Sequence, residues 1–78
     1  MFFLTITAVN TKLFEGEVSS VTAPADEGEV TILAHHEPFV SVLKKGIITV
    51  RVEGAEPKSF EVEKGILEVG GNKATILV

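Results

Sequence analysis

The sequence contains no cysteine, tryptophan or tyrosine, and no apolar run long enough to cross a bilayer. The lack of cysteine excludes disulfides and thiolate chemistry, and it fits a reducing compartment. The lack of tryptophan and tyrosine leaves few of the aromatic platforms on which sugar- and base-binding domains rely. A membrane-spanning helix needs about 20 consecutive apolar residues, and the start of the chain lacks the basic segment of a signal peptide. We therefore expect no disulfide, no thiolate chemistry, no membrane-spanning helix and no signal peptide in this chain.

Length and charge narrow the class further. The chain has 78 residues, 45% of them hydrophobic, and a formal net charge of -4. This length and composition indicate one small folded domain, residues 1–78, rather than a disordered tail. The acidic balance argues against general nucleic-acid binding, which needs lysine and arginine clustered on one face.

Apolar and polar residues alternate along most of the chain. Leu4 and Ile6 alternate with threonines, and Ile48, Val50 and Val52 alternate with polar residues. A period of two is typical of a half-buried strand, and no stretch of ten residues shows helical spacing. The pattern predicts an all-β fold, namely a small antiparallel β-sandwich of about ten short strands in two sheets.

Three local signals refine this fold. The strand that contains Val18 is expected to stop at Pro24, since proline cannot donate to a sheet. Gly16 indicates a bulge or a close approach of two backbones. The sequence Gly70-Gly71-Asn72 predicts a tight hairpin turn.

The stretch from Pro24 to Gly46 is rich in loop signals and holds both histidines. Loops on a rigid scaffold are where binding residues concentrate. His35 and His36 suggest a metal site, but adjacent side chains on extended backbone point to opposite faces. A zinc site also needs three or four protein ligands, and the sequence has no third histidine. Loop or interface histidines are the favoured interpretation.

The same stretch carries an acidic cluster made of Asp26, Glu27, Glu29 and Glu37. Its spacing does not match a calcium-binding loop, so a solvated loop is favoured, with an acidic contact to a partner as the alternative. The Gly65–Gly71 segment has the outline of a phosphate-binding loop but lacks the lysine and hydroxyl residue that follow. We expect no catalytic constellation and no cofactor, and a domain that binds through a face or a loop.

Five motifs follow one another in close spacing, namely those at Phe14–Val18, Ser20–Leu33, His36–Pro38, Leu43–Val50 and Gly65–Val69. Each motif alone is a strand with a turn, but the ordered set is specific. The set resembles the N-terminal domain of the epsilon subunit of F-type ATP synthase, whose mitochondrial counterpart is called delta. The resemblance covers essentially the whole chain.

The resemblance implies a ten-stranded β-sandwich at the foot of the central stalk. There the domain binds the γ subunit and the polar loops of the membrane c-ring, and couples ion flow to ATP synthesis. It implies no catalysis and no bound nucleotide of its own. It also implies a peripheral position on the cytoplasmic face of the bacterial plasma membrane, or the organellar equivalent.

The chain departs from the family in two places. The family usually has Pro-Gly-His-x-Pro where this chain has Ala-His-His-Glu-Pro at Ala34–Pro38, which leaves the shape of this loop open. The family usually continues into two α-helices that inhibit ATP hydrolysis and, in some members, bind ATP. Since this sequence stops at Val78, we expect those helical functions to be absent from this polypeptide.

Site residues are carried over from the family position by position. Glu29 matches a position near the c-ring loops, and His36 lies in a loop that the family places near γ. We therefore expect a partner interface made of Glu27, Glu29, His36, Glu37 and Pro38.

Two other functions stay open. Lys44 or Lys45 at a hairpin tip is the kind of residue that carrier domains modify, although the flanking residues differ from those of such domains. A free-standing sandwich that binds a small molecule is the second alternative, and it predicts a pocket.

Overall fold

A computed structural model describes residues 1–35 and 37–78, which form nine β-strands. The all-β class predicted from the sequence is confirmed, with nine strands in the described residues where about ten were expected. The strands are β1 Phe2–Thr7, β2 Lys12–Val18, β3 Ser20–Ala25, β4 Gly28–Leu33, β5 Phe39–Leu43, β6 Gly46–Arg51, β7 Lys58–Val62, β8 Gly65–Gly70 and β9 Lys73–Leu77.

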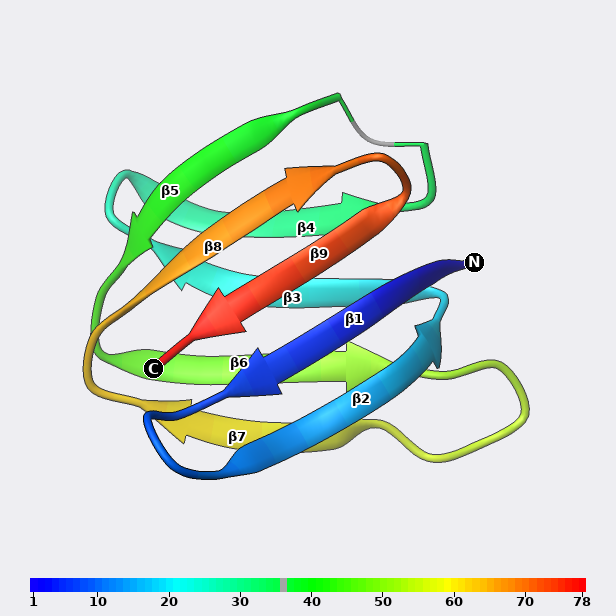
Figure 1. Cartoon of the computed structure of the whole chain (residues 1–78), viewed down its shortest axis with the longest axis horizontal. Coiled ribbons are helices and arrows are strands. Elements are labelled where there is room, and N and C mark those ends of the chain that lie inside the picture. The colour runs from blue at the N-terminus through cyan, green and yellow to red at the C-terminus, as the bar shows by residue number, and fades with distance from the viewer. Residues whose placement is uncertain (36) are drawn as a thin grey trace.

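Hydrogen bonds join the strands into one curled sheet that folds over into two layers (Figure 1). The first layer has the order β2-β1-β9-β8-β5, and the second has the order β4-β3-β6-β7. The layers share a corner, where Ala25 of β3 pairs with Leu43 of β5. The result is a small β-sandwich with its connections at two opposite ends.

One pairing departs from the expected antiparallel arrangement. β1 and β9 run parallel, with Leu4 opposite Ala74 and Ile6 opposite Ile76. The other pairings are antiparallel. β9 runs antiparallel to β8 because the two strands form a hairpin, and in this direction it lies parallel to β1.

The core lies between the layers and takes alternate residues from each strand. Burial alternates along β1, β6 and β8, as the period of two predicts. Removing these side chains from water is the main favourable term in folding. The buried hydrophobic residues are Phe2, Leu4, Ile6, Val18, Val21, Ala23, Ala25, Ile32, Leu43, Ile48, Val50, Val62, Leu67, Val69, Ala74 and Ile76.

The strand predicted to run from Val18 and to stop at Pro24 is wrong at both ends, because Val18 closes β2 and β3 runs from Ser20 through Pro24 to Ala25. The pairing of β3 with β6 covers Ser20–Thr22, and the pairing with β5 begins at Ala25. Pro24 lies in the gap between these two pairings, so its missing N–H interrupts neither. Its carbonyl still accepts a hydrogen bond from the Lys44 backbone N–H at 2.9 Å.

The irregularity in β2 is at Leu13, so the structure shows neither the bulge nor the close backbone approach that was predicted at Gly16. The register of β1 against β2 shifts after the pair Ile6 and Phe14, which makes Leu13 the extra residue. Gly16 lies opposite Leu4 in regular register.

The hairpin predicted at Gly70-Gly71-Asn72 is confirmed. β8 ends at Gly70 and β9 begins at Lys73. The two residues between them, Gly71 and Asn72, have φ angles of 58° and 60°. Two successive left-handed residues are typical of the turn whose twist matches its strands.

Candidate functional site

The structure places the predicted interface residues in two groups at opposite ends of β4 (Figure 1). Glu27 lies in the two-residue turn between β3 and β4, and Glu29 projects from β4; both are exposed. Glu37 and Pro38 are also exposed and precede β5. A strand of six residues separates groups at its two ends by roughly 17 Å. The predicted residues therefore do not form one cluster, and His36 lies outside the described residues.

β5 connects these two groups. It begins directly after Pro38, and its far end is held against the acidic turn. The backbone N–H of Asp26 donates to the carbonyl of Val42 at 2.9 Å. Whatever binds along β5 therefore meets the β4–β5 connection at one end and the acidic turn at the other.

The outer face of β5 carries an exposed apolar patch that it shares with β8 and β9. We call Val40, Val42, Ile66 and Leu77 the apolar patch; they are between 43% and 68% exposed. Three of them form one row across the strands, since Ile66 lies opposite both Leu77 and Val42. A hollow of about 390 Å³ lies over this row, next to Lys64 and the C-terminal Val78. Contiguous apolar surface of this kind marks interaction sites on soluble proteins.

Sequence patterns did not reveal the apolar patch because β5 is apolar on both faces. Its one polar residue, Ser41, faces inward, where its hydroxyl donates to the Val42 carbonyl at 3.2 Å. Simple alternation gives no signal for the orientation of such a strand. The sequence did offer a signal on β8. Glu68 is charged and lies on the outer face, so Ile66, two residues before it, lies on the same outer face.

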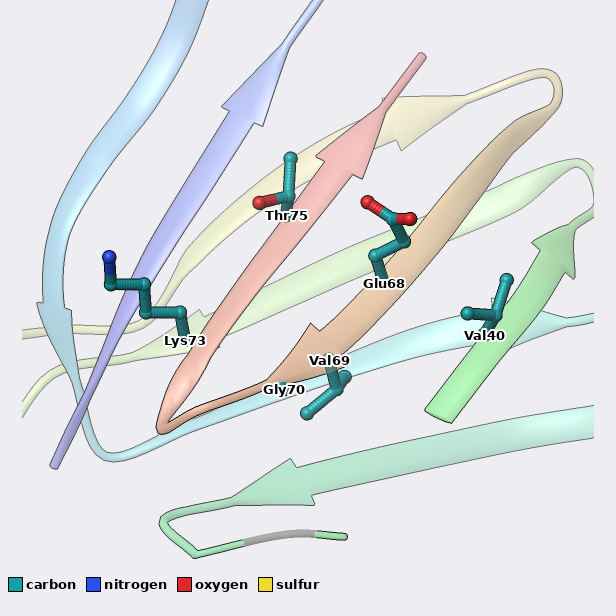
Figure 2. Close-up of a pocket in the computed structure, with 6 residues that line it drawn as sticks. All are labelled: Val40, Glu68, Val69, Gly70, Lys73 and Thr75. Carbon is teal, nitrogen blue, oxygen red and sulfur yellow. The ribbon is translucent and has the colours of Figure 1, made fainter. Parts of the chain in front are cut away.

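A second hollow adjoins the apolar patch and is more polar (Figure 2). It has a volume of about 350 Å³ and lies over β8 and β9, next to Val40. Figure 2 shows that Glu68, Lys73 and Thr75 project from the same side of the sheet, whereas Val69 projects from the other side. Gly70, which has no side chain, also lines this hollow.

The polar hollow offers one carboxylate, one ammonium group and one hydroxyl on an open sheet. Ligand sites usually enclose most of a small molecule between walls, and these side chains stand on a single face (Figure 2). The geometry suits a rim of polar contacts around the apolar patch. In residues 1–35 and 37–78, no group of three or more His, Cys, Asp or Glu is placed to hold a metal ion. None of the elements in these ranges is a helix long and apolar enough to cross a membrane.

The backbone at His35, at the start of the β4–β5 connection, is left-handed, with a φ angle of 64°. This is the left-handed region that glycine adopts at no steric cost and other residues seldom enter. His35 thus has a glycine-like backbone at the position where the resemblance described above leads us to expect glycine.

Comparison with known proteins gives matches over nearly the whole chain. The sequence model of the family described as "ATP synthase, Delta/Epsilon chain, beta-sandwich domain" matches residues 1–78. The "ATP synthase epsilon chain 1" of Methylococcus capsulatus is 47% identical over 72 residues. The "ATP synthase epsilon chain" of Caulobacter vibrioides is 42% identical over 72 residues. Each alignment covers 92% of this chain.

The relatives differ in how much of their length is matched. The chain spans 51% of the Methylococcus relative and 83% of the Caulobacter relative. A similar solved structure is a chain in the Euglena gracilis mitochondrial ATP synthase, described as "OSCP/F1/c-ring in rotational state 1". The two chains superpose with a TM-score of 0.92 at 29% identity, over 99% of this chain and 49% of that one.

Proposed function

Since the chain belongs to the delta/epsilon family of ATP synthase subunits, we propose that it is a rotor component of the central stalk. In this role it joins the γ subunit to the c-ring, so that ion flow through the ring turns the shaft that drives ATP synthesis. The observation that carries this proposal is the apolar patch, which lies between the two groups of predicted interface residues. An exposed apolar row of this kind supports a role in binding another protein.

The γ subunit is assigned to the apolar patch. A rotor must stay assembled while it turns, and permanent interfaces are more apolar than transient ones. The patch presents three apolar side chains in one row, with Glu68 and Lys73 as polar groups beside it. This arrangement of an apolar centre and a polar rim is that of a stable interface.

The c-ring is assigned to the acidic turn. Glu27 and Glu29 are exposed at the end of the sandwich where β5 closes on β3. The polar loops of the ring suit charged partners, and each exposed ion pair contributes about 0.2–1 kcal/mol. Glu37 and Pro38, at the opposite end of β4, would then lie on the γ side.

The chain itself does no chemistry in this account. The carboxylates and lysines of the described residues are all exposed, and no group of three or more His, Cys, Asp or Glu in these ranges is placed to hold a metal ion. The proposal includes no cofactor and no bound nucleotide. It places the chain on the cytoplasmic face of the bacterial plasma membrane, or the organellar equivalent, held there through the c-ring.

A sandwich also suits the mechanical role. Torque passes through this domain without loss only if the domain deforms little. Protein cores are packed as densely as organic crystals and have low compressibility. The two layers share a continuous buried core, to which each of the nine described strands contributes at least one residue; β2 contributes only Val18.

Isothermal titration of the chain with purified γ subunit from the same source tests the proposal. We expect one chain to bind one γ with a dissociation constant below about 1 μM. This corresponds to a favourable binding free energy of roughly 8 kcal/mol or more. The ATPase rate of the catalytic complex is then measured with and without the chain, and we expect no strong inhibition. Absence of binding at tens of micromolar would reject the rotor role and favour the free-standing ligand-binding sandwich. A mass shift at Lys44 or Lys45 in the intact protein would instead favour the carrier domain.

A further inference from the structure

Asn72, in the turn between β8 and β9, bonds to two segments that are distant in sequence. Its side-chain oxygen accepts a hydrogen bond from the backbone N–H of His35 at 3.3 Å. Its side-chain nitrogen donates to the carbonyl of Met1 at 3.1 Å. Its own carbonyl accepts from the N–H of Phe3 at 3.2 Å. One exposed residue therefore ties the hairpin tip to the N-terminus and to the start of the β4–β5 connection.

The bond to His35 acts at a sensitive point of the backbone. His35 and Asn72 are the two residues other than glycine with positive φ in the described ranges. A left-handed residue costs free energy and persists only where surrounding contacts hold it. The Asn72 oxygen supplies such a contact to the His35 N–H, and the next described residues are the predicted interface residues Glu37 and Pro38.

We propose that Asn72 is a positioning residue that fixes the start of the β4–β5 connection in the orientation needed for partner binding. The inference rests on the proposed function, because it takes γ as the partner of Glu37 and Pro38. Asn72 touches no partner residue in this account and acts through His35. Sequence patterns assigned Asn72 only to a hairpin turn.

Asparagine suits this position for two reasons. It tolerates the left-handed conformation better than most residues, and its amide carries both an acceptor and a donor. Aspartate would keep the acceptor for His35 and lose the donor for Met1. Glycine would keep the turn and lose both side-chain bonds, so these two variants separate the two bonds without straining the hairpin.

The experiment measures three quantities on Asn72→Gly, Asn72→Asp and the unaltered chain. They are hydrogen exchange at the His35 amide, the dissociation constant for γ, and the midpoint of urea unfolding. Asn10→Gly is the matched control, because Asn10 is an exposed turn residue at the other end of the sandwich. In Asn72→Gly we expect His35 exchange to rise about 3- to 10-fold, the factor that one net hydrogen bond supplies. We expect the dissociation constant for γ to rise by a similar factor in Asn72→Gly and to stay unchanged in Asn10→Gly. The unfolding midpoint of Asn72→Gly should fall only modestly, because two hydrogen bonds are lost while glycine adopts the left-handed backbone at no steric cost.

Asn72→Asp should keep most of the His35 protection and of the γ affinity. If Asn72→Gly bound γ as tightly as the unaltered chain, the positioning role would be rejected and the proposed function would stand. If His35 exchange did not change, the hydrogen bond from Asn72 would not hold this backbone, and the proposal would fail. If the unaltered chain did not bind γ, the proposed function and the positioning role would fall together.

Discussion

The ring of Phe14 on β2 meets the ring of Phe60 on β7 edge to face, with centroids 6.2 Å apart and planes at 65°. β2 and β7 are the two ends of the curled sheet, and no backbone pairing joins them in the described chain. Edge-to-face aromatic pairs contribute about 0.5–1.5 kcal/mol beyond the area that they bury. This contact therefore holds the two layers together at the edge where hydrogen bonds do not.

The first prediction concerns this edge. Phe60→Ala should lower the free energy of unfolding by about 2–3 kcal/mol, somewhat less than a fully buried phenylalanine, since Phe60 is half-buried. Urea unfolding of Phe14→Ala, Phe60→Ala and the double variant gives the coupling energy between the rings. We expect about 0.5–1.5 kcal/mol. A coupling near zero would show that the two rings stabilise their own layers independently.

The second prediction compares two glycines on β8. A methyl group at Gly65 would meet the backbone carbonyl oxygen of Leu77, whereas one at Gly70 would have no heavy atom within 4 Å. Backbone atoms cannot yield as a side chain does, so Gly65→Ala should lower the free energy of unfolding by at least about 2 kcal/mol. Gly70→Ala should leave it unchanged or raise it by up to about 1 kcal/mol. Thermal unfolding of the two variants checks this, and equal effects would contradict the packing described at Gly65.

The third prediction tests the apolar patch with a matched pair of isoleucines. Ile66 lies in the patch and is 43% exposed, and Ile47 lies on the outer face of the other layer and is 48% exposed. Ile66→Asp should weaken γ binding about 10-fold or more, as expected for a central interface residue. Ile47→Asp should leave the affinity within about twofold, because surface substitutions away from an interface change little. Titration calorimetry measures both, and an equal loss of affinity would remove the patch from the γ interface.

The fourth prediction concerns the acidic turn. Glu29→Lys should clearly reduce the rate of ATP-driven proton pumping, because it reverses a charge at the predicted contact. It should change the free energy of unfolding of the domain little, because Glu29 is exposed. Glu61→Lys is the control, since Glu61 is exposed on β7, at the opposite edge of the same layer. The effect should shrink at high salt, where surface charges are screened. Normal pumping by Glu29→Lys membranes would remove Glu29 from the c-ring contact.

Much of the fold could be predicted because burial and sequence alternation coincide. The positions of Ile48 and Val50 in the core follow from their spacing alone, and both are fully buried. The extent of β3 could not be predicted, because the tolerance of Pro24 depends on a change of neighbouring strand that no local pattern contains. The parallel pairing of β1 with β9 is likewise a property of the whole topology.

The candidate site was predicted less completely. The acidic turn at Glu27 and the connection at Pro38 are visible in the sequence as loops, and the structure shows both exposed. What lies between them depends on which face of β5 turns outward. Val40 and Val42 could be assigned to the surface only once β5 was paired with β8.

The coupling role is tested most directly by proton pumping in membrane vesicles stripped of this subunit. The chain is added back to vesicles that retain γ, the catalytic head and the c-ring, and ATP-driven acidification is followed together with ATP hydrolysis. If the chain joins γ to the ring, pumping should return in proportion to the chain bound, and the Ile66→Asp chain should require a higher concentration. If the chain binds and hydrolysis continues while pumping does not return, the rotor role proposed here is contradicted.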